Sequence, residues 1–226
     1  MSIAALILGE SGTGKTAALR NLDPHKTLLI QTVRKPLPFR SAGWAYFTPE
    51  NKAGNVMVSD LSSQIVALIN RTKRPVVVLD DFQYLLANEF MRRSEETGFQ
   101  KFSDIAKHAW DVLNAAANAA DFKRVYILGH TQTDDAGHVR AKTIGRLLDE
   151  KIVLEGLLSI VLRTHVQGGE YRFSTRNNGS DTVKTPMGLF DTDLIDNDLA
   201  AVDAAIVAYY GITEPEQQEQ PEQKAA

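Results

Sequence analysis

The chain has 226 residues, 43% of them hydrophobic, and a formal net charge of −3. This length suits one α/β domain rather than two, and the charge excludes a global basic field that would draw the whole chain to nucleic acid. The sequence contains no cysteine, which excludes disulfides, thiolate zinc sites and cysteine nucleophiles and fits a reducing compartment.

The first residues carry no basic segment ahead of an apolar run, so they do not resemble a signal peptide. No apolar run approaches the roughly 20 residues that a membrane-spanning helix needs. We therefore expect a cytoplasmic protein with no membrane partner.

Strands and helices alternate through the first 130 residues. Continuous apolar runs predict buried strands, and helical patterning follows most of them. Asp60 is a candidate N-cap for the second helix. The alternation predicts an α/β fold with a mainly parallel, doubly wound sheet. We expect strands at residues 3–8, 27–33, 44–47, 55–59, 75–79 and 124–129, and helices at residues 15–22, 61–72, 82–94 and 102–120.

The last third of the chain has a different pattern. Two alternating runs separated by Gly168-Gly169 predict a β-hairpin that extends the sheet edge. Gly211 is expected to end a C-terminal helix. We divide the chain into one folded domain at residues 1–212 and a disordered acidic Gln/Glu/Pro tail at residues 213–226. The expected segments are a loop at 131–142, a partly helical stretch at 143–155, the hairpin strands at 157–166 and 171–175, a loop at 177–186 and the helix at 198–210.

A glycine-rich segment follows the first expected strand and has the pattern G-x-x-x-x-G-K-T. Its glycines let successive backbone N–H groups point at phosphate oxygens. Lys15 would reach the β- and γ-phosphates, the hydroxyl of Thr16 would bind Mg²⁺, and the following helix would add its positive end. The alternative is a glycine-rich turn with no ligand. The pattern predicts a site for ATP and Mg²⁺ made by Gly9, Glu10, Ser11, Gly12, Thr13, Gly14, Lys15 and Thr16.

Two aspartates end the apolar run at residues 76–79. P-loop enzymes hold Mg²⁺ with an acid at the end of a neighbouring buried strand, so Asp80 is the expected metal residue. Asp81 follows it and could orient the attacking water. Alternatively, one or both aspartates cap the helix that starts near Phe82.

With both motifs placed, the chain resembles RecA-type P-loop ATPases. More narrowly, it resembles the phage-encoded RecA-like ATP-binding proteins of the Sak type, which are associated with single-strand annealing and recombination. The resembling segments are GESGTGKT, VVVLDDFQYLLANEFMRR, RVYILGHTQTD and NNGSDTVKTPMGLF. The first of these is specific for P-loop proteins in general, and the other three are weaker.

This resemblance implies a RecA-like fold, ATP binding, and weak or DNA-stimulated hydrolysis. It further implies single-stranded DNA binding and a homo-oligomer in the host cytoplasm, with a phage or host single-strand-binding protein as a candidate partner.

The chain departs from the recombinase pattern in two places. RecA-like recombinases usually carry a catalytic glutamate near the end of the strand after the P-loop helix, whereas this chain has Gln-Thr-Val-Arg at residues 31–34. Asp81, Glu50 or Asp60 could substitute for that glutamate. Recombinases also have a segment before the core that docks on the neighbouring subunit, and this chain starts at its first core strand. Slow hydrolysis and a different assembly geometry are therefore expected.

His130 directly follows the strand expected at residues 124–129. In the RecA-like fold, the strand beside the P-loop strand typically ends in a polar residue that senses the γ-phosphate. A neutral histidine or an amide can donate to this phosphate or hold the attacking water, so we expect His130 to be the sensor, ahead of Gln132. The alternative is a histidine that only ends the strand.

RecA-like ATPases often complete their sites with an arginine or lysine from the next subunit, which stabilises transition-state charge. The resemblance favours Arg176 and Lys184 as catalytic residues of this kind, ahead of Arg163 and Arg172. Each of the four could instead be an ordinary solvated charge.

Two segments mix basic and stacking residues in the way that single-stranded DNA binding requires, and the DNA loops of RecA-like proteins emerge near these points. The alternative is solvated helix faces and a mobile loop. The acidic residues at 214–222 could compete for a basic groove, recruit a partner or only add solubility. The expected DNA-binding residues are Arg92, Arg93 and Lys101 in the first segment and Arg140 and Lys142 in the second, beside Phe90, Met91, Phe99, Phe102, His138 and Arg146.

Three functions fit these features. The first is an ATP-dependent protein that acts on single-stranded DNA in recombination or annealing. The second is an ATP-driven switch or loader that acts on a protein partner without DNA dependence. The third is a small-molecule kinase with residues 131–146 as a lid, although the sequence has no acceptor signature. We rank them in this order.

Overall fold

The computed structural model describes residues 2–215, apart from the side chains of residues 149 and 150, and it is built on an eight-stranded sheet. The strand order is β10-β9-β8-β1-β5-β4-β2-β3, and β6 pairs with β7 in a separate ribbon. The strands are β1 (Ile3–Leu8), β2 (Thr27–Gln31), β3 (Val56–Val58), β4 (Val76–Asp80), β5 (Arg124–Gly129), β6 (Thr131–Thr133), β7 (Val139–Ala141), β8 (Ile160–Gln167), β9 (Glu170–Ser174) and β10 (Leu194–Asp196).

The strands from β8 to β3 in this order all run parallel, and β9 and β10 continue the sheet in antiparallel fashion. Every residue of β1, β4 and β5 is buried, as expected for apolar strands covered on both faces. The turn between β8 and β9 uses Gly168 and Gly169, both with positive φ. The expected parallel sheet with a hairpin extension is therefore confirmed.

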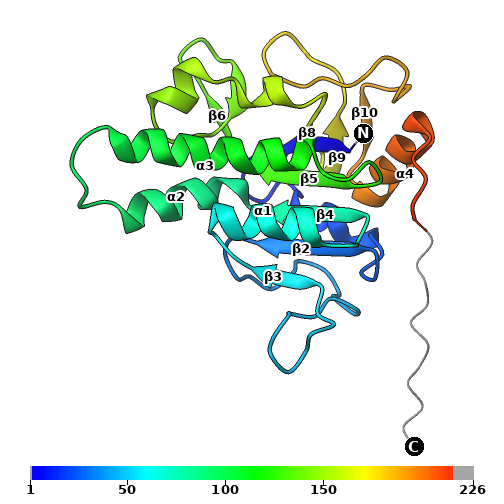
Figure 1. Ribbon diagram of the computed structural model, residues 1–226. Helices are drawn as coiled ribbons and strands as arrows, with labels where there is room; N and C mark the ends of the chain where they lie inside the picture. The colour runs from blue at the N-terminus through cyan, green and yellow to red at the C-terminus, as the bar shows by residue number, and fades with distance from the viewer. Residues whose placement is uncertain (1, 216–226) are drawn as a thin grey trace, which may run out of the picture.

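Helices cover both faces of the sheet, so the doubly wound arrangement is also confirmed. The helices α1, α2 and α3 lie over one face (Figure 1), where they pack on side chains such as Leu6 and Ile127. The segments η1 and α4 pack on the other face against Ile7 and Leu128. The helical segments are η1 (Thr16–Asn21), α1 (Ser62–Arg71), α2 (Phe82–Arg92), α3 (Gln100–Ala117), η2 (Leu147–Lys151), η3 (Leu154–Leu157) and α4 (Leu199–Tyr210).

The register of the parallel strands aligns their carboxyl ends. Leu8 of β1 lies opposite Gly129 of β5, and Asp80 of β4 lies between Gln31 of β2 and Leu128 of β5. Ligands of open α/β sheets bind outside these carboxyl ends. The P-loop, the two aspartates and His130 all leave the sheet at this edge.

Residues 131–142 differ from the expected polar loop, because they form the antiparallel ribbon of β6 and β7. Gln132 lies opposite Arg140, and the carboxylate of Asp134 closes the turn by accepting the backbone N–H groups of Ala136 and His138. A short ribbon of polar residues has no apolar alternation, so the sequence pattern could not reveal it.

The helix after the P-loop is shorter and tighter than expected. Residues 16–21 form the 3₁₀ helix η1 instead of an α-helix over residues 15–22. Arg20 donates to the backbone carbonyl of Asn197, and Asn21 donates to Asp198. These tertiary bonds tie η1 to the start of α4, and the short 3₁₀ segment of six residues leaves less of a helix dipole than expected.

Two further expectations were wrong. Asp60 does not cap α1, because Leu61 occupies the N-cap position and the Asp60 carboxylate accepts hydrogen bonds from Asn88 and Arg92. Residues 44–47 form no strand and contribute only an isolated bridge between Tyr46 and Val56. The strand β10 lay outside the expected elements.

The C-terminal helix follows its sequence signals. The side chain of Asp198 accepts the N–H groups of Ala200 and Ala201, and Gly211 ends the helix with a φ of 61°. The tail expected at residues 213–226 is described only as far as Pro215, and its remaining residues lie outside the described part. Among helices within residues 2–215, none is long and apolar enough to cross a bilayer.

Arg124, at the start of β5, is buried in an ion-pair network at the amino end of the sheet. Its side chain is 2% exposed and contacts the carboxylates of Asp203 and Glu214 at 2.8 Å each. The hydroxyl of Tyr126 donates to the same Asp203 carboxylate. This network holds α4 and the residues after it against the sheet.

We predict that Asp203→Ala destabilises the protein by about 3–5 kcal/mol, because it removes the main partner of a buried guanidinium. Urea unfolding measures this change. Asp111→Ala, which breaks an exposed pair with Lys107, is the control and should cost under about 1 kcal/mol. Equal costs for the two variants would show that the Arg124 network does not anchor α4.

Candidate nucleotide-binding site

The P-loop joins β1 to η1 and surrounds the ammonium group of Lys15. The Nζ atom donates to the backbone carbonyls of Gly9 and Glu10, each at 2.8 Å. Burial lowers the pKa of Lys15, while the carboxylates of Asp81 and Asp80 act in the opposite direction. Lys15 therefore caps the carbonyls of its own loop, and a phosphate that offers stronger charged acceptors could replace them.

Two glycines of this loop are needed for close approach. A Cβ atom at Gly9 would lie 1.9 Å from Oγ1 of Thr164 on β8, and that hydroxyl also donates to Thr13. Gly14 has a φ of +95°, and a Cβ atom there would lie 3.0–3.2 Å from Tyr171 and Asn197. The loop is thus packed closely against the hairpin side of the sheet.

Thr16 and Asp80 meet across the carboxyl edge. The Thr16 hydroxyl lies 3.1 and 3.2 Å from the two carboxylate oxygens of Asp80. Burial raises the pKa of Asp80 to about 6, and the neighbouring Asp81 adds to this shift. A divalent cation between these two side chains would remove both penalties on the ionised carboxylate.

Asp81 and His130 form a second pair in the same place. Asp81 Oδ2 lies 2.7 Å from His130 Nε2, and the backbone of Asp81 is held by the Thr32 hydroxyl, which donates to its carbonyl at 2.7 Å. Asp81 occupies the N-cap position of α2, yet its side chain makes no capping bond. The alternative that Asp81 serves as a helix cap is therefore excluded.

These residues line one cavity of about 630 Å³, within the usual size of a small-molecule site. Two buried atoms in its lining lack a hydrogen-bond partner within residues 2–215: the acceptor Asp81 Oδ1 and the donor Asn197 Nδ2. Orphaned buried polar atoms are rare, because leaving them unpaired is costly. A nucleotide with its phosphate oxygens and an attacking water offers both kinds of partner.

The cavity also contains residues that the motifs did not indicate. Lys35 and Tyr84 line it beside Asp81 and His130, and Tyr171, Asn197 and Arg20 line it beside Gly14. Arg20 follows the P-loop on η1 and Tyr84 follows Asp81 on α2. The other three come from the loop after β2, from β9 and from the residue after β10, and no pattern linked them to the P-loop. Only the cationic and aromatic character of Lys35 and Tyr171 gave a weak signal.

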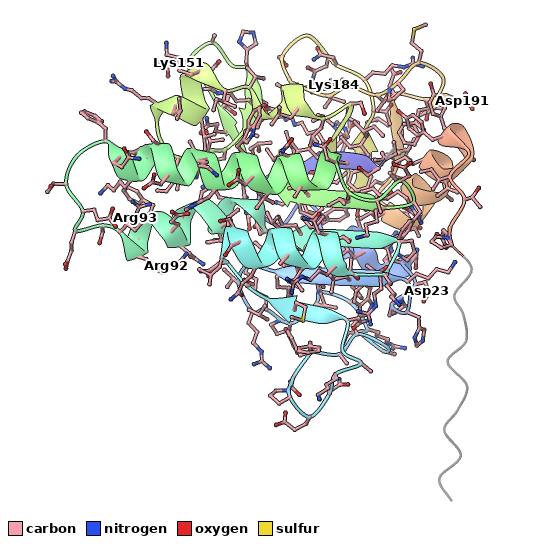
Figure 2. All side chains as sticks on the ribbon, in the orientation of Figure 1. Asp23, Arg92, Arg93, Lys151, Lys184 and Asp191 are labelled. Carbon is pink, nitrogen blue, oxygen red and sulfur yellow. The ribbon has the colours of Figure 1, made fainter. Side chains whose placement is uncertain are left out.

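The residues expected to act from a neighbouring subunit are not among those that line this cavity. Arg176 is exposed and pairs with Asp193 at 2.7 Å. Lys184 forms a backbone bridge with Val161 of β8 and has an exposed side chain at the margin of the molecule (Figure 2). Their action on another subunit stays a prediction.

Of the residues expected to bind DNA, those near the α2–α3 turn are engaged in local contacts. Arg92 pairs with Asp60, and Arg93 pairs with Glu89, Glu96 and Asp104. Both arginines lie at the end of α2 (Figure 2) and line a larger cavity of about 960 Å³ on the helical face. Nearby carboxylates therefore offset much of the positive charge there.

Lys101 has an equally local role, because its ammonium group donates to backbone carbonyls, including that of Glu96 at 2.8 Å.

The second segment that was expected to bind DNA lies closer to the nucleotide site. Arg140 and Lys142 lie on or beside β7, and the Lys142 N–H donates to the His130 carbonyl at 2.8 Å.

The residues present fit a magnesium ion that arrives with a nucleotide. Mg²⁺ is usually held by one or two protein groups together with phosphate oxygens and waters, and Thr16 and Asp80 supply two such groups. Within residues 2–215, no group of three or more His, Asp or Glu side chains is placed to hold a metal ion. The site therefore has the ligands of a nucleotide-bound cation rather than of an all-protein metal centre.

Comparison with known proteins leaves the family open. No protein-family model matches the sequence, and no curated protein matches it significantly. Solved structures do match, among them a KaiC-like protein from the hyperthermophilic archaeon Pyrococcus horikoshii. That match has a TM-score of 0.47 and 14% identity and covers 81% of this chain and 83% of the other. A likeness at this level leaves the reaction and the partners of the chain undetermined.

We predict that Asp80→Asn stabilises the magnesium-free protein at pH 8. The pKa of Asp80 is about 6 in the folded chain and about 3.8 in the unfolded chain. Between about pH 4 and pH 6 the folded state therefore binds more protons than the unfolded state. The free energy of unfolding of the wild type therefore decreases as the pH rises from about 4 through 6. The variant should exceed the wild type by roughly 2–3 kcal/mol at pH 8 and by little at pH 4.

Urea unfolding in EDTA at both pH values checks this expectation. The difference between the two pH values is the decisive quantity, because a general effect of the amide would be the same at both. A stability gain that does not change with pH would contradict the burial penalty on Asp80.

Proposed function

We propose that this chain is a magnesium-dependent ATPase of the RecA type. The single observation that carries the proposal is the convergence of three strand ends, those of β1, β4 and β5, on one cavity. The Lys15 loop, the Thr16–Asp80 contact and the Asp81–His130 pair all line it. This is the set of groups that phosphoryl transfer to water needs, namely phosphate cradle, metal ligands and a residue to position the water.

His130 and Asp81 are proposed to activate the attacking water. A carboxylate can only accept, so the short contact is proposed to have His130 Nε2 as the donor, which would leave Nδ1 to accept a proton from the water. Asp81 then orients the ring and stabilises its charged form, as the acid does in other histidine–carboxylate pairs. This pair takes the place of the glutamate that the chain lacks.

In the proposed reaction, the water oxygen forms a bond to the γ-phosphorus, and the bond from that phosphorus to the β,γ-bridging oxygen breaks. The electron pair goes to ADP, and the water proton goes to His130. Lys15 would leave the carbonyls of Gly9 and Glu10 to bind phosphate oxygens, and Thr16 and Asp80 would hold the cation. Mg²⁺, when bound, neutralises charge on the β- and γ-phosphates.

We predict that Lys15→Ala abolishes ATP binding, whereas His130→Ala retains binding and lowers kcat by about 10²-fold or more. The physical reason is that Lys15 contacts the phosphates in the ground state, and His130 acts only on the water. Equilibrium binding of a fluorescent ATP analogue and steady-state phosphate release measure the two effects. His25→Ala, an exposed histidine before β2, is the matched control and should behave as wild type. Wild-type protein that binds ATP without releasing phosphate would reduce the proposal to a nucleotide-binding protein.

As a second step we propose that single-stranded DNA stimulates this ATPase through the β6–β7 ribbon. The ribbon begins at the residue after His130, and the hydrogen bond from Lys142 N–H to the His130 carbonyl joins its far end to the same residue. A phosphate backbone bound at Arg140 and Lys142 would thus act directly on the position of His130. Arg92 and Arg93 lie at the opposite end of α2 from Asp81, which makes the α2–α3 turn the weaker candidate.

We predict that single-stranded DNA raises the ATPase rate, with an effect that falls steeply as salt rises. Lys142→Ala should reduce this stimulation several-fold without changing the DNA-free rate. Lys107→Ala, an exposed lysine on α3, is the control. A DNA-independent rate in the wild type would favour the alternative, a switch or loader that acts on a protein partner. Transfer of phosphate to a small molecule would favour a kinase.

A further inference from the structure

The loop after β2 places a second lysine at the cavity. Lys35 lines it together with Lys15, Asp80, Asp81 and His130. Its ammonium group lies 4.8 Å from the centre of the Tyr84 ring, and that ring meets the His130 ring edge-on at 6.3 Å. Lys35, Tyr84 and His130 thus form a row along the wall of the cavity.

The backbone of Lys35 is held in place by the residue at the end of β2. Gln31 is 1% exposed, and its Nε2 donates to the Lys35 carbonyl at 3.0 Å. The hydroxyl of Tyr46 donates to Gln31 Oε1 at 2.9 Å and lies 3.2 Å from the same Lys35 carbonyl. A lysine on a mobile loop would lose backbone conformational entropy when it binds a phosphate. Because the backbone of Lys35 is already ordered in the folded chain, this entropy is not lost again on binding.

Gln31 lies near the strand end where RecA-like recombinases usually carry their catalytic glutamate, and its side chain has a different role. Gln31 lies opposite Asp80 in the sheet, yet its amide turns to the loop and contacts Lys35 instead of the cavity. The end of β2 therefore serves to position the backbone of Lys35. The charge of Lys35 acts on both Asp80 and Lys15, although burial is the larger influence on the pKa of each.

We propose that Lys35 is a catalytic residue that contacts the γ-phosphate of ATP bound in its own chain. The inference rests on the proposed ATPase function. Charge on the γ-phosphoryl oxygens and the bridging oxygen shifts as the bond from phosphorus to water forms and the bond to ADP breaks. Lys35 donates hydrogen bonds to these oxygens and keeps its proton, while the water proton goes to His130. The site then has two lysines, Lys15 and Lys35, from one chain, and it needs no arginine or lysine from a neighbouring subunit.

The first test removes the charge and keeps the stem of the side chain. Lys35→Met should lower kcat by about 10²-fold while the Kd of an ATP analogue changes less than about threefold, because the contact strengthens only in the transition state. Lys35→Arg should recover part of the rate. Lys52→Ala, which removes an exposed lysine from the same loop outside this cavity, is the control and should be normal. An unchanged kcat in Lys35→Met would overturn the proposal.

The second test separates action within a chain from action between chains. Lys35→Met, which keeps its P-loop, is mixed with Lys15→Ala, which cannot bind ATP but keeps Lys35. If Lys35 acts within its chain, the mixture should show no more ATPase activity than the sum of the two proteins. Activity well above that sum would show that Lys35 serves a neighbouring site and would overturn the proposal.

The outcomes distinguish failure of this inference from failure of the proposed function. Wild-type protein without ATPase activity, with and without DNA, would remove both. Active wild type with an equally active Lys35→Met removes only the role of Lys35, and a rate loss in Arg176→Ala or Lys184→Ala would then locate the missing cation on the hairpin side.

Discussion

The parallel pairing of β5 with both β1 and β4 holds the site together. It sets Leu8 opposite Gly129 and Leu128 opposite Asp80, so three loops leave the sheet at one level. A shift of one residue in either pairing would turn every side chain of that strand to the other face. The P-loop, Asp80 and His130 meet only because this register is fixed by apolar side chains on both faces of the sheet.

The charges at this edge suit a cation that is bound together with a polyphosphate. Two aspartates lie side by side in a buried position, and burial raises the pKa of Asp80 to about 6. Lys15 meanwhile contacts carbonyls of its own loop. A cation with a polyphosphate would satisfy both groups together, because the cation offsets the carboxylates and the phosphate replaces the carbonyls. Binding of the proposed ligand would therefore offset the cost of burying both groups.

The end of β2 departs from the recombinase pattern, because it carries a glutamine and no glutamate. Because this strand ends in Gln31, β2 supplies no acid to the cavity, which by sequence alone pointed to slow hydrolysis. In the folded chain, Asp81 and His130 form a short pair from the two neighbouring strands, and Gln31 fixes the backbone of Lys35. The proposed functional groups are therefore distributed differently over the same sheet edge, with a histidine–carboxylate pair and a lysine on the loop after β2.

The sequence by itself determined the parts that depend on local chemistry. The glycine spacing of the P-loop, the apolar runs that end at Asp80 and His130, and the caps of α4 at Asp198 and Gly211 are all contiguous signals. They were sufficient to predict the parallel sheet, the hairpin extension and the meeting of Thr16 with Asp80. The role of His130 and the action of Arg176 and Lys184 between subunits remain predictions.

Only the tertiary structure decided which remote side chains share the cavity. Lys35, Tyr84 and Asn197 come from a loop, a helix and a strand end without a common motif, and their meeting depends on packing across the whole sheet. The polar β6–β7 ribbon also required the folded chain, because its pairing depends on backbone hydrogen bonds that leave no apolar period in the sequence. The same packing assigned the Asp60 carboxylate to Asn88 and Arg92 instead of to a helix cap. Local patterns specify elements and motifs, whereas contacts between elements are set by the three-dimensional register of the strands.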